Sequence, residues 1–433
     1  KLRLGLGLGL PGPASAQALQ ELYDAARQYD ATFLGAQALA ASAEFRAAQV
    51  EALGRPSVNA TAAASTAQTD PPKVANRGSD SVQGGISARL PLFNRANQAS
   101  IAQARKSLET AQADLASAEQ DLIIRVSQAY FDVLAAQDAL ATTRASKSFI
   151  TEQLASAKRN FEVGTATITD TREAQARFDL GTAQEIAADN DLRTKRIALD
   201  QLVGRPGVVP KLLLVPVVLP APMPANAEEW VGLSDTQHPS VRRARVALDV
   251  ASLEISKARA GDLPTVDAVA SLGTSDTRGS LPNLSRSSGT SAVGSVGVQL
   301  NWPLYTGGAT QNRIKETLLL EERSRNDVEV ARRGVAQATR VAYFGVQSGL
   351  AQVRALEAAE ASSKLALEAT QLGYKVGVRV NLDVLNAQTQ LFTTQRDLAK
   401  ARYDVLVGSL RLRQASGQLL PTDVDSVNRL LAR

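Results

Sequence analysis

The chain repeats itself once at nearly constant spacing. A duplication of this kind predicts two similar structural units that pack against each other. The matching motifs lie 212 or 213 residues apart (302 − 90 = 212; 342 − 129 = 213; 374 − 161 = 213). We therefore divide the chain into repeat 1, residues 17–220, and repeat 2, residues 221–433. The motif pairs are LPLF at 90–93 with WPLY at 302–305, AYF at 129–131 with AYF at 342–344, and FEVG at 161–164 with YKVG at 374–377.

Each repeat is expected to run helix, strand, loop, strand, long helix, turn and long helix. In repeat 1, a helix from about 18 to 53 precedes strands at about 57–67 and 80–92 and long helices at about 96–163 and 168–203. In repeat 2, a helix precedes strands at about 264–274 and 290–304, long helices at about 308–376 and 381–416, and a C-terminal tail.

The strands have one apolar and one polar face. Val82, Ile86 and Leu90 alternate with polar residues such as Gln83 and Arg89, a period of two that predicts a half-buried strand. After the prolines that we place at the strand-to-helix junctions, Pro91 and Pro303, the apolar period changes to seven residues, as in Leu108, Leu115 and Leu122. The 68 residues from 96 to 163 predict a helix of about 100 Å.

Composition excludes several classes of protein. The net charge of +5 is interspersed along the helical stretches, which argues against a nucleic-acid groove. Cysteine is absent, which excludes a disulfide framework and a thiolate metal site. Residues 1–16 combine basic residues, a short apolar run and small residues, as expected of a signal peptide cleaved after Ala16. Later segments are too short to be membrane helices, so we expect any membrane crossing to be made by the strands.

Four amphipathic strands cannot form a closed membrane barrel alone, and open strand edges are not tolerated in lipid. We therefore expect several chains to share one barrel, which contacts outer-membrane lipid, while the polar helices lie in the periplasm. The alternative is a soluble coiled-coil protein with a small capping sheet. In the barrel interpretation, the lumen would be lined by Arg89, Gln299 and Asn301, the lipid contacted by Ile86, Val298 and Leu300, and the membrane interface occupied by an aromatic girdle of Phe93, Trp302 and Tyr305.

The repeated plan, the two strand-ending motifs and the paired turns together resemble the TolC family of outer-membrane factors. The resemblance implies a mainly α-helical homotrimer with a membrane β-barrel, a tunnel of long coiled-coil helices, and an equatorial belt including about 204–229 and the tail after 417. It also implies two partners, a periplasmic adaptor protein and an inner-membrane ABC transporter or proton-driven RND pump. Similarity at 381–412 and the missing acylated cysteine favour type I protein secretion; drug efflux is the alternative.

The resemblance further implies a periplasmic gate at the two helix turns, which end at Gly164 and Gly377. Arginine-to-carboxylate links around a three-fold axis would hold neighbouring helices together. Asn386 departs from the family pattern, since some relatives carry a second acidic residue there. In the alternative interpretation, both glycines simply end helices and the two aspartates cap the next ones. The gate positions are Thr169, Asp170, Tyr374, Arg379, Asp383 and Asn386.

His238 is the single histidine of the chain, and Pro239 follows it where a helix is expected to begin. A metal site needs more ligands, and a nucleophilic triad needs partners that the spacing does not suggest. We therefore expect no metal, cofactor or catalytic site, and no enzymatic activity.

Overall fold

The computed structural model describes residues 16–69, 77–165, 167–214, 216–279 and 289–432. The expected signal peptide lies outside the described residues except for Ala16, and so does most of the loop within each strand pair. The chain divides into two compact units. Unit 1 comprises Lys1–Ala38, Asp114–Arg242 and Ala331–Arg433, and unit 2 comprises Leu39–Ala113 and Arg243–Val330.

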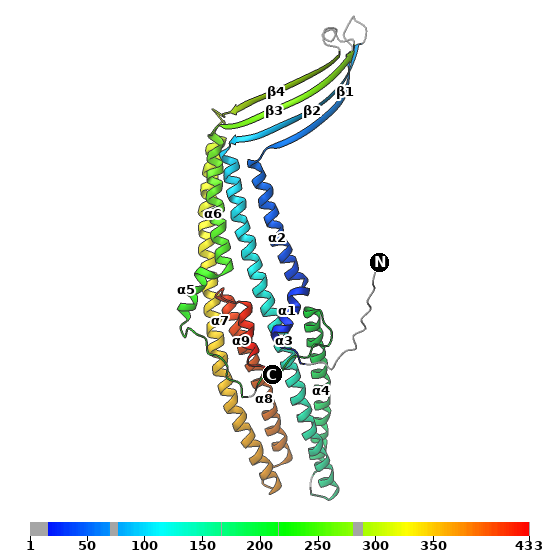
Figure 1. Ribbon diagram of the computed structural model, residues 1–433. Helices are drawn as coiled ribbons and strands as arrows, with labels where there is room; N and C mark the ends of the chain where they lie inside the picture. The colour runs from blue at the N-terminus through cyan, green and yellow to red at the C-terminus, as the bar shows by residue number, and fades with distance from the viewer. Residues whose placement is uncertain (1–15, 70–76, 166, 215, 280–288, 433) are drawn as a thin grey trace. The chain divides into compact units, whose positions relative to one another are not determined.

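Long helices and one sheet make up the chain (Figure 1). The helices of repeat 1 are α1 (Leu19–Tyr29), α2 (Ala31–Glu51), α3 (Arg95–Glu162) and α4 (Ile168–Val203). Those of repeat 2 are α5 (Ala227–Gln237), α6 (Pro239–Arg259), α7 (Ala309–Lys375), α8 (Asn381–Ala415) and α9 (Pro421–Asn428). The strands are β1 (Ser57–Thr69), β2 (Arg77–Phe93), β3 (Thr265–Gly279) and β4 (Gly289–Asn301). Within the described residues, no helix combines the length and apolar character needed to cross a membrane.

The first helix is broken, contrary to the expectation of one helix from about 18 to 53. Asp30 separates α1 from α2 with an extended ψ of 112°. Its Oδ1 accepts a hydrogen bond from the backbone N–H of Phe33 (2.8 Å), and both carboxylate oxygens accept from Arg125 (2.9 Å each). Asp30 thus caps α2, and the Arg125 side chain holds the pKa of its carboxyl below the ordinary value.

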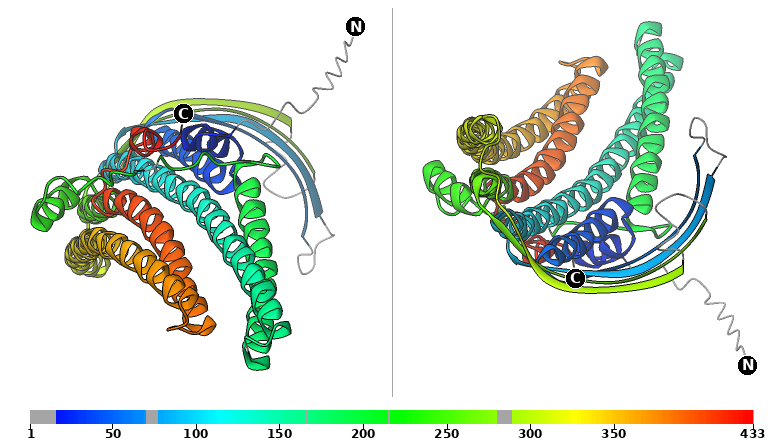
Figure 2. Two further views of the ribbon diagram at one scale, coloured as in Figure 1. Left: turned by 90° about the horizontal axis from the view of Figure 1, so that it is seen from below. Right: turned by 90° about the horizontal axis from the view of Figure 1, so that it is seen from above.

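Unit 2 contains a four-stranded antiparallel sheet in the order β1-β2-β3-β4. Strands β2 and β3 come from different repeats yet pair along their lengths, so the sheet joins the two repeats. In cross-strand register, Ala60 faces Ile86, Ile86 faces Leu272, and Leu272 faces Gly294. The sheet is strongly curved when seen end-on (Figure 2).

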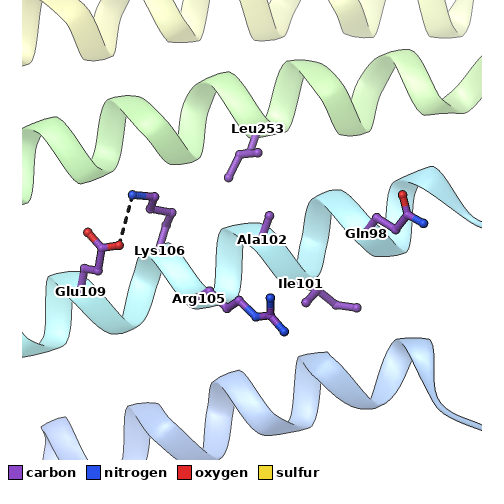
Figure 3. Close-up of a pocket in the computed structure, with 7 residues that line it drawn as sticks. All are labelled: Gln98, Ile101, Ala102, Arg105, Lys106, Glu109 and Leu253. Atoms are coloured by element: carbon purple, nitrogen blue, oxygen red, sulfur yellow. Dashed lines mark ion pairs between the residues drawn. The ribbon is translucent and has the colours of Figure 1, made fainter.

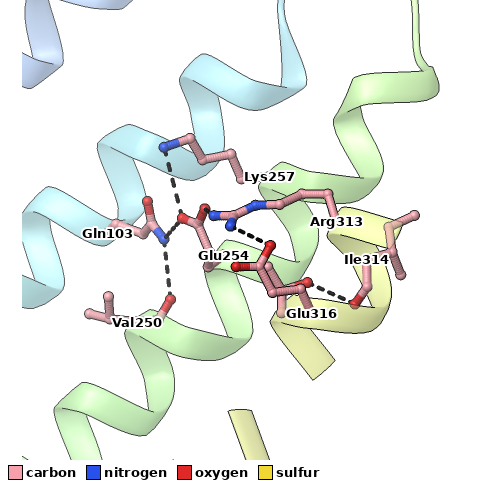
Figure 4. A network of polar contacts seen from close by, with 8 residues as sticks. Gln103, Val250, Glu254, Lys257, Arg313, Ile314 and Glu316 are labelled. Carbon is pink, nitrogen blue, oxygen red and sulfur yellow. Dashed lines mark hydrogen bonds and ion pairs between the residues drawn. The ribbon is translucent and has the colours of Figure 1, made fainter. Parts of the chain in front are cut away.

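Polar contacts tie three helices of unit 2 together (Figure 4). Glu254 on α6 accepts hydrogen bonds from Gln103 on α3 (2.8 Å) and Arg313 on α7 (2.7 Å). Both contacts lower the pKa of Glu254, with Gln103 the larger cause. A groove of about 500 Å³ along α3, with Leu253 of α6 at its edge, is rimmed by Arg105 and Lys106 (Figure 3). These two cations already pair with carboxylates of unit 2, so the groove does not present a free positive charge.

The core of unit 1 displays the duplication in atomic detail. Tyr130 and its counterpart Tyr343 each donate a hydroxyl hydrogen bond to a backbone carbonyl, of Lys211 (2.9 Å) and Ala225 (2.8 Å) respectively. Each tyrosine also packs edge-to-face against the phenylalanine that follows it, at 5.4 Å and 5.6 Å between ring centroids. Both repeats therefore use the AYF motif to attach a long helix to a connecting segment.

The environments of the two phenylalanines differ. Phe131 is buried and stacks on Tyr403 of α8 at 5.6 Å, whereas its counterpart Phe344 on α7 is 56% exposed. Tyr403 also donates a hydrogen bond to Asp138 (2.6 Å), so α8 packs along α3 through both apolar and polar contacts. The equivalent face of α7 lacks such a cover among the described residues.

Candidate channel wall and helix-turn gate

One face of the sheet is apolar and exposed. The cross-strand register places the even-numbered apolar residues of all four strands on this face. Val296 is 89% exposed, and most other large side chains of the face are exposed as well, while Leu90 and Val266 are half-buried. A continuous apolar surface of this kind suits contact with lipid or another protein. Its large exposed members are Val58, Val82, Ile86, Leu272, Val296, Val298 and Leu300.

The opposite face is polar and rich in hydroxyl groups. Three cross-strand serine pairs form hydrogen bonds of 2.7–2.9 Å on this face, which stabilise the strand register without introducing charge. Arg89, Gln299 and Asn301, expected to line a lumen, all belong to the polar face. The serine pairs are Ser65 with Ser81, Ser271 with Ser295, and Ser275 with Ser291.

The three aromatic residues expected at a membrane interface lie where β2 and β4 lead into helices. Phe93 is the last residue of β2, and Trp302 and Tyr305 follow β4. All three are exposed, Tyr305 by 89%, and Trp302 Nε1 donates to the carbonyl of Asp262 (3.2 Å). Because β2 and β4 run in the same direction, these residues lie at the same end of the sheet, where both strands finish.

The structure corrects the place of one junction proline. Strand β2 continues through Pro91 to Phe93, so the strand-to-helix junction is Asn94. Pro91 is tolerated because it lies beyond the last pair between β1 and β2 and at a register shift against β3, where a missing N–H costs least. Pro303 does lie in the segment between β4 and α7.

Gly164 lies in the turn between α3 and α4, two residues after α3 ends at Glu162, and its φ of 78° favours glycine. Thr167 and Asp170 then form a capping box at the start of α4: the Thr167 N–H and hydroxyl both donate to Asp170 Oδ2, and the Asp170 N–H donates to Thr167 Oγ1. Thr169 is exposed in the first turn of α4. The N-cap of α4 is therefore Thr167, not Asp170 as the alternative interpretation expected; Asp170 is its partner in the capping box and is still partly exposed.

Gly377 lies in the turn between α7 and α8, two residues after α7 ends at Lys375, with φ of 82°. The carbonyl of Gly373 accepts from the N–H groups of Val378 (2.9 Å) and Arg379 (3.2 Å), and a Cβ on Gly373 would approach Arg379 Cγ to 2.8 Å. Arg379 is thus folded back over Gly373. Its guanidinium lies 3.6 Å from the carboxylate of Asp383 in α8, an ion pair within the turn rather than a cap.

Two polar contacts join the two helix hairpins of unit 1 near their turns. Asn160 on α3 donates to the hydroxyl of Tyr374 on α7 (3.4 Å), and Arg177 on α4 donates to Asn386 on α8 (3.0 Å). The structure therefore brings Tyr374 and Asn386 into hairpin-to-hairpin contacts. Neither Asn160 nor Arg177 was predicted as a partner from the sequence; Arg177 lies seven residues after Asp170, a spacing that marks one helix face.

His238 has a structural role before the first turn of α6. Its Nδ1 accepts from the backbone N–H of Ser240 (3.1 Å) at the start of α6, consistent with a residue that leads a helix. Among the residues that the structure describes, no group of three or more His, Cys, Asp or Glu side chains could hold a metal ion.

The family model described as outer membrane efflux protein matches the chain twice, over residues 22–205 and 230–418, one match in each repeat. The outer membrane protein TolC of Vibrio cholerae is 34% identical over 416 residues, covering 95% of this chain and 93% of that protein. The alkaline protease secretion protein AprF of Pseudomonas aeruginosa is 35% identical over 358 residues, covering 81% of this chain and 73% of AprF.

A solved structure of the outer membrane protein VceC from Vibrio cholerae is similar with a TM-score of 0.77 at 20% identity, covering 92% of this chain and 96% of VceC. This likeness shows that the two proteins share a fold. The repeated plan, the two-faced sheet, the family match and the identity to TolC lead to one conclusion. The chain belongs to the TolC family of outer membrane efflux proteins, and it is a channel protein of the outer membrane, not the soluble coiled-coil protein considered as an alternative.

Proposed function

We propose that three copies of the chain form the outer-membrane exit duct of a tripartite export machine. The observation that carries the proposal is the two-faced sheet with open edges. In the described part of the chain, β1 pairs with β2 alone and β4 pairs with β3 alone. Open edges are unstable in lipid, so β4 of one copy pairs with β1 of the next until the barrel closes. Three copies of four strands supply twelve, an even number that suits a membrane barrel.

The duplication supports the same assembly in the helices. Within one chain, α8 covers Phe131 of α3 through Tyr403. By the 213-residue offset, the counterparts are Phe344 on α7 and Asn190 on α4 (344 − 131 = 213; 403 − 190 = 213). Both counterparts are exposed in the single chain. The α4 helix of a neighbouring copy would therefore cover Phe344 as α8 covers Phe131.

Cysteine crosslinking tests this assembly. The natural chain has no cysteine, so a Phe344→Cys/Asn190→Cys double variant carries only the two thiols of interest. Under oxidising conditions we expect a ladder on denaturing gels that ends at three chains. Each single variant is the matched control and should run as one chain. A double variant that is never crosslinked, in a protein whose mass in detergent is that of one chain, would refute the trimer.

We assign the duct to type I protein secretion, with a periplasmic adaptor and an inner-membrane ABC transporter as partners. The support is the 35% identity to AprF, a protein named for alkaline protease secretion. The sequence lacks a phosphate-binding loop, so energy has to come from the inner-membrane partner. The description of the matching family, outer membrane efflux protein, favours drug efflux with a proton-driven pump as the second candidate.

A deletion strain separates the two assignments. Loss of a secreted protein from the medium, restored by the chain supplied on a plasmid, supports protein secretion. A strain that keeps its secreted proteins but becomes sensitive to drugs reverses the assignment. Crosslinking in intact cells, followed by mass spectrometry of the captured inner-membrane protein, identifies the partner as an ABC transporter or as a proton-driven RND pump.

The proposed gate is the ring of helix turns formed by the three copies. Arg379 and Asp383 lie on one turn and Thr169 and Asp170 on the other, and all four are at least partly exposed. Around a three-fold axis each charge occurs three times, so links from Arg379 to carboxylates of a neighbouring chain would hold the aperture closed. The contacts of Tyr374 with Asn160 and Asn386 with Arg177 keep the two hairpins of one chain together beside it.

A further inference from the structure

The central part of the polar face is almost free of charge. This part consists of the odd-numbered positions of 59–65, 79–89, 267–277 and 291–301, and it leaves out the strand ends, among them Arg77 at the start of β2. At these positions the side chains are hydroxyls, amides, glycines and small apolar groups, and Arg89 and Asp267 are the two ionisable residues.

These two residues neutralise each other. Arg89 Nη2 lies 2.5 Å from Asp267 Oδ2 across the β2–β3 pair. Asp267 is 3% exposed, whereas the Arg89 side chain is 61% exposed. The carboxylate of Asp267 is therefore buried, whereas the guanidinium of Arg89 reaches the surface. A buried carboxylate of this kind requires its cation, because an unpaired buried charge is costly.

We propose that the Arg89–Asp267 pair sets the charge selectivity of the β-lined part of the duct, by keeping its wall neutral toward cargo of either sign. The inference rests on the proposed trimer, in which the polar face lines the water-filled lumen. Each copy contributes one pair, so loss of either partner would place three like charges at one level of the lumen. An uncompensated ring of this kind favours the oppositely charged solute. With the pair intact, the hydroxyl-rich wall admits a polypeptide that carries both signs.

A single cysteine reports the local potential. Ser87 is exposed, lies two residues before Arg89 on the same face, and pairs with Ser271. Two residues along a strand span about 7 Å, within the Debye length of about 10 Å at 0.1 M salt. In Ser87→Cys protein reconstituted in liposomes, the measured quantity is the ratio of labelling rates with a cationic and an anionic methanethiosulfonate. This readout does not depend on the aperture at the helix turns when the reagents enter from the barrel side.

The matched control is Val293→Cys on the same face. Val293 pairs with Gly273, six residues along β3 from Asp267, or about 20 Å. At that distance the potential of the pair is screened, so the ratio at this position should not respond to changes in the pair.

The expected result has opposite signs for the two partners. On the Ser87→Cys background, Arg89→Gln should shift the ratio about threefold toward the cationic reagent, because Arg89 is only two residues from Ser87. Asp267→Asn should shift the ratio toward the anionic reagent by a smaller factor, because Asp267 lies four residues along β3 from Ser271, the partner of Ser87, or about 13 Å. The ratio of the double variant Arg89→Gln/Asp267→Asn should lie between those of the two single variants. Asn matches Asp in size, whereas Gln is shorter than Arg, so heat-stable trimers on gels are needed to confirm that each variant assembles. If one single variant does not assemble, the other single variant and the double variant still test the inference.

Two failures are distinguishable. If the thiols introduced by Ser87→Cys and Val293→Cys are labelled only after denaturation, the polar face is not a wet lumen and the proposed channel wall fails. If both thiols are labelled in the folded protein but neither substitution in the pair changes the ratio in the Ser87→Cys background, the channel wall stands and the inference about the pair is overturned.

Discussion

Gly204 lies against the ring of Tyr29. Gly204 ends α4 in the left-handed conformation, with φ of 74°, and a Cβ added to it would overlap Cγ of the Tyr29 ring. Tyr29 is the last residue of α1, so the two helix ends of unit 1 meet at a position where a side chain has no room. Gly207 has nearly the same φ, 75°, but a Cβ there would meet open space.

Substitution of Gly204 by alanine should therefore cost more than substitution of Gly207. Each change loses about 1 kcal/mol because alanine disfavours positive φ. Gly204→Ala adds a steric clash of about 1–3 kcal/mol, since the tyrosine ring has to move. Thermal unfolding of the purified protein, followed by circular dichroism, should show a clearly lower midpoint for Gly204→Ala. Equal midpoints for the two variants would contradict the close packing of Gly204 on Tyr29.

The Asp30–Arg125 pair should give a pH-dependent contribution to stability. Because its folded-state pKa is lowered, Asp30 stabilises the fold fully above its unfolded value of about 3.9, and this contribution is lost as pH falls through the folded value. Asp30→Ala removes the cap of α2 and leaves Arg125 without this carboxylate, at a cost of about 1–3 kcal/mol near pH 7. The difference in unfolding midpoint between natural protein and variant should shrink at pH 3. A difference independent of pH would show that the cap, and not the ion pair, dominates.

Asp138 should behave in the opposite way. Burial raises the pKa of its carboxyl, and the hydrogen bond from Tyr403 only partly offsets this effect. The charged form therefore carries a penalty in the fold that is present above the raised pKa and disappears as pH falls below the unfolded value. Asp138→Asn keeps an acceptor for the Tyr403 hydroxyl and removes the charge, so its midpoint at pH 7 should equal or exceed that of the natural protein.

Asp138→Ala is the control for this prediction. It removes the acceptor and leaves the Tyr403 hydroxyl without this partner in a buried position, which should cost about 1–3 kcal/mol. If Asp138→Asn were as destabilising as Asp138→Ala, the charge itself would be required, and the proposed penalty would be wrong.

The strands and long helices could be predicted because their signals are local. Alternation of apolar residues marks β2 and β4, and Gly164 and Gly377 mark the ends of the first helix of each hairpin. The break at Asp30 could not be predicted in this way. Its sequence context suits a continuous helix, and the cap is reinforced by Arg125, which lies 95 residues away.

Long-range partners account for the other differences. Strand β2 continues through Pro91 because β3, from the other repeat, still pairs with it there. The contacts of Asn386 with Arg177 and of Asp267 with Arg89 join residues 209 and 178 positions apart, so no local pattern could pair them. The faces of the sheet were predictable, whereas the partners of its charges were not.

The gate can be tested with substitutions that respect the capping box of α4. Asp170→Ala would fray the helix, because Asp170 accepts the N–H of Thr167. Asp170→Asn retains an acceptor and removes the charge. Loss of an exposed ionic link of about 0.5–1 kcal/mol shifts an equilibrium between closed and open forms by about two- to fivefold. We therefore expect Arg379→Ala and Asp170→Asn each to raise the conductance of the trimer in planar bilayers.

Arg396→Ala is the control for Arg379→Ala. Arg396 lies on α8, likewise beside a carboxylate, Asp397, but more than a dozen residues beyond the turn that holds Arg379, so its loss should leave conductance unchanged. Gly373→Ala gives an independent test, because the added methyl group displaces Arg379 without removing its charge. If conductance rises with Arg379→Ala and Gly373→Ala but not with Arg396→Ala, the ionic links that hold the aperture closed lie at the turn. If Arg379→Ala and Asp170→Asn leave the conductance equal to that of the natural protein, packing of the helix turns alone closes the aperture.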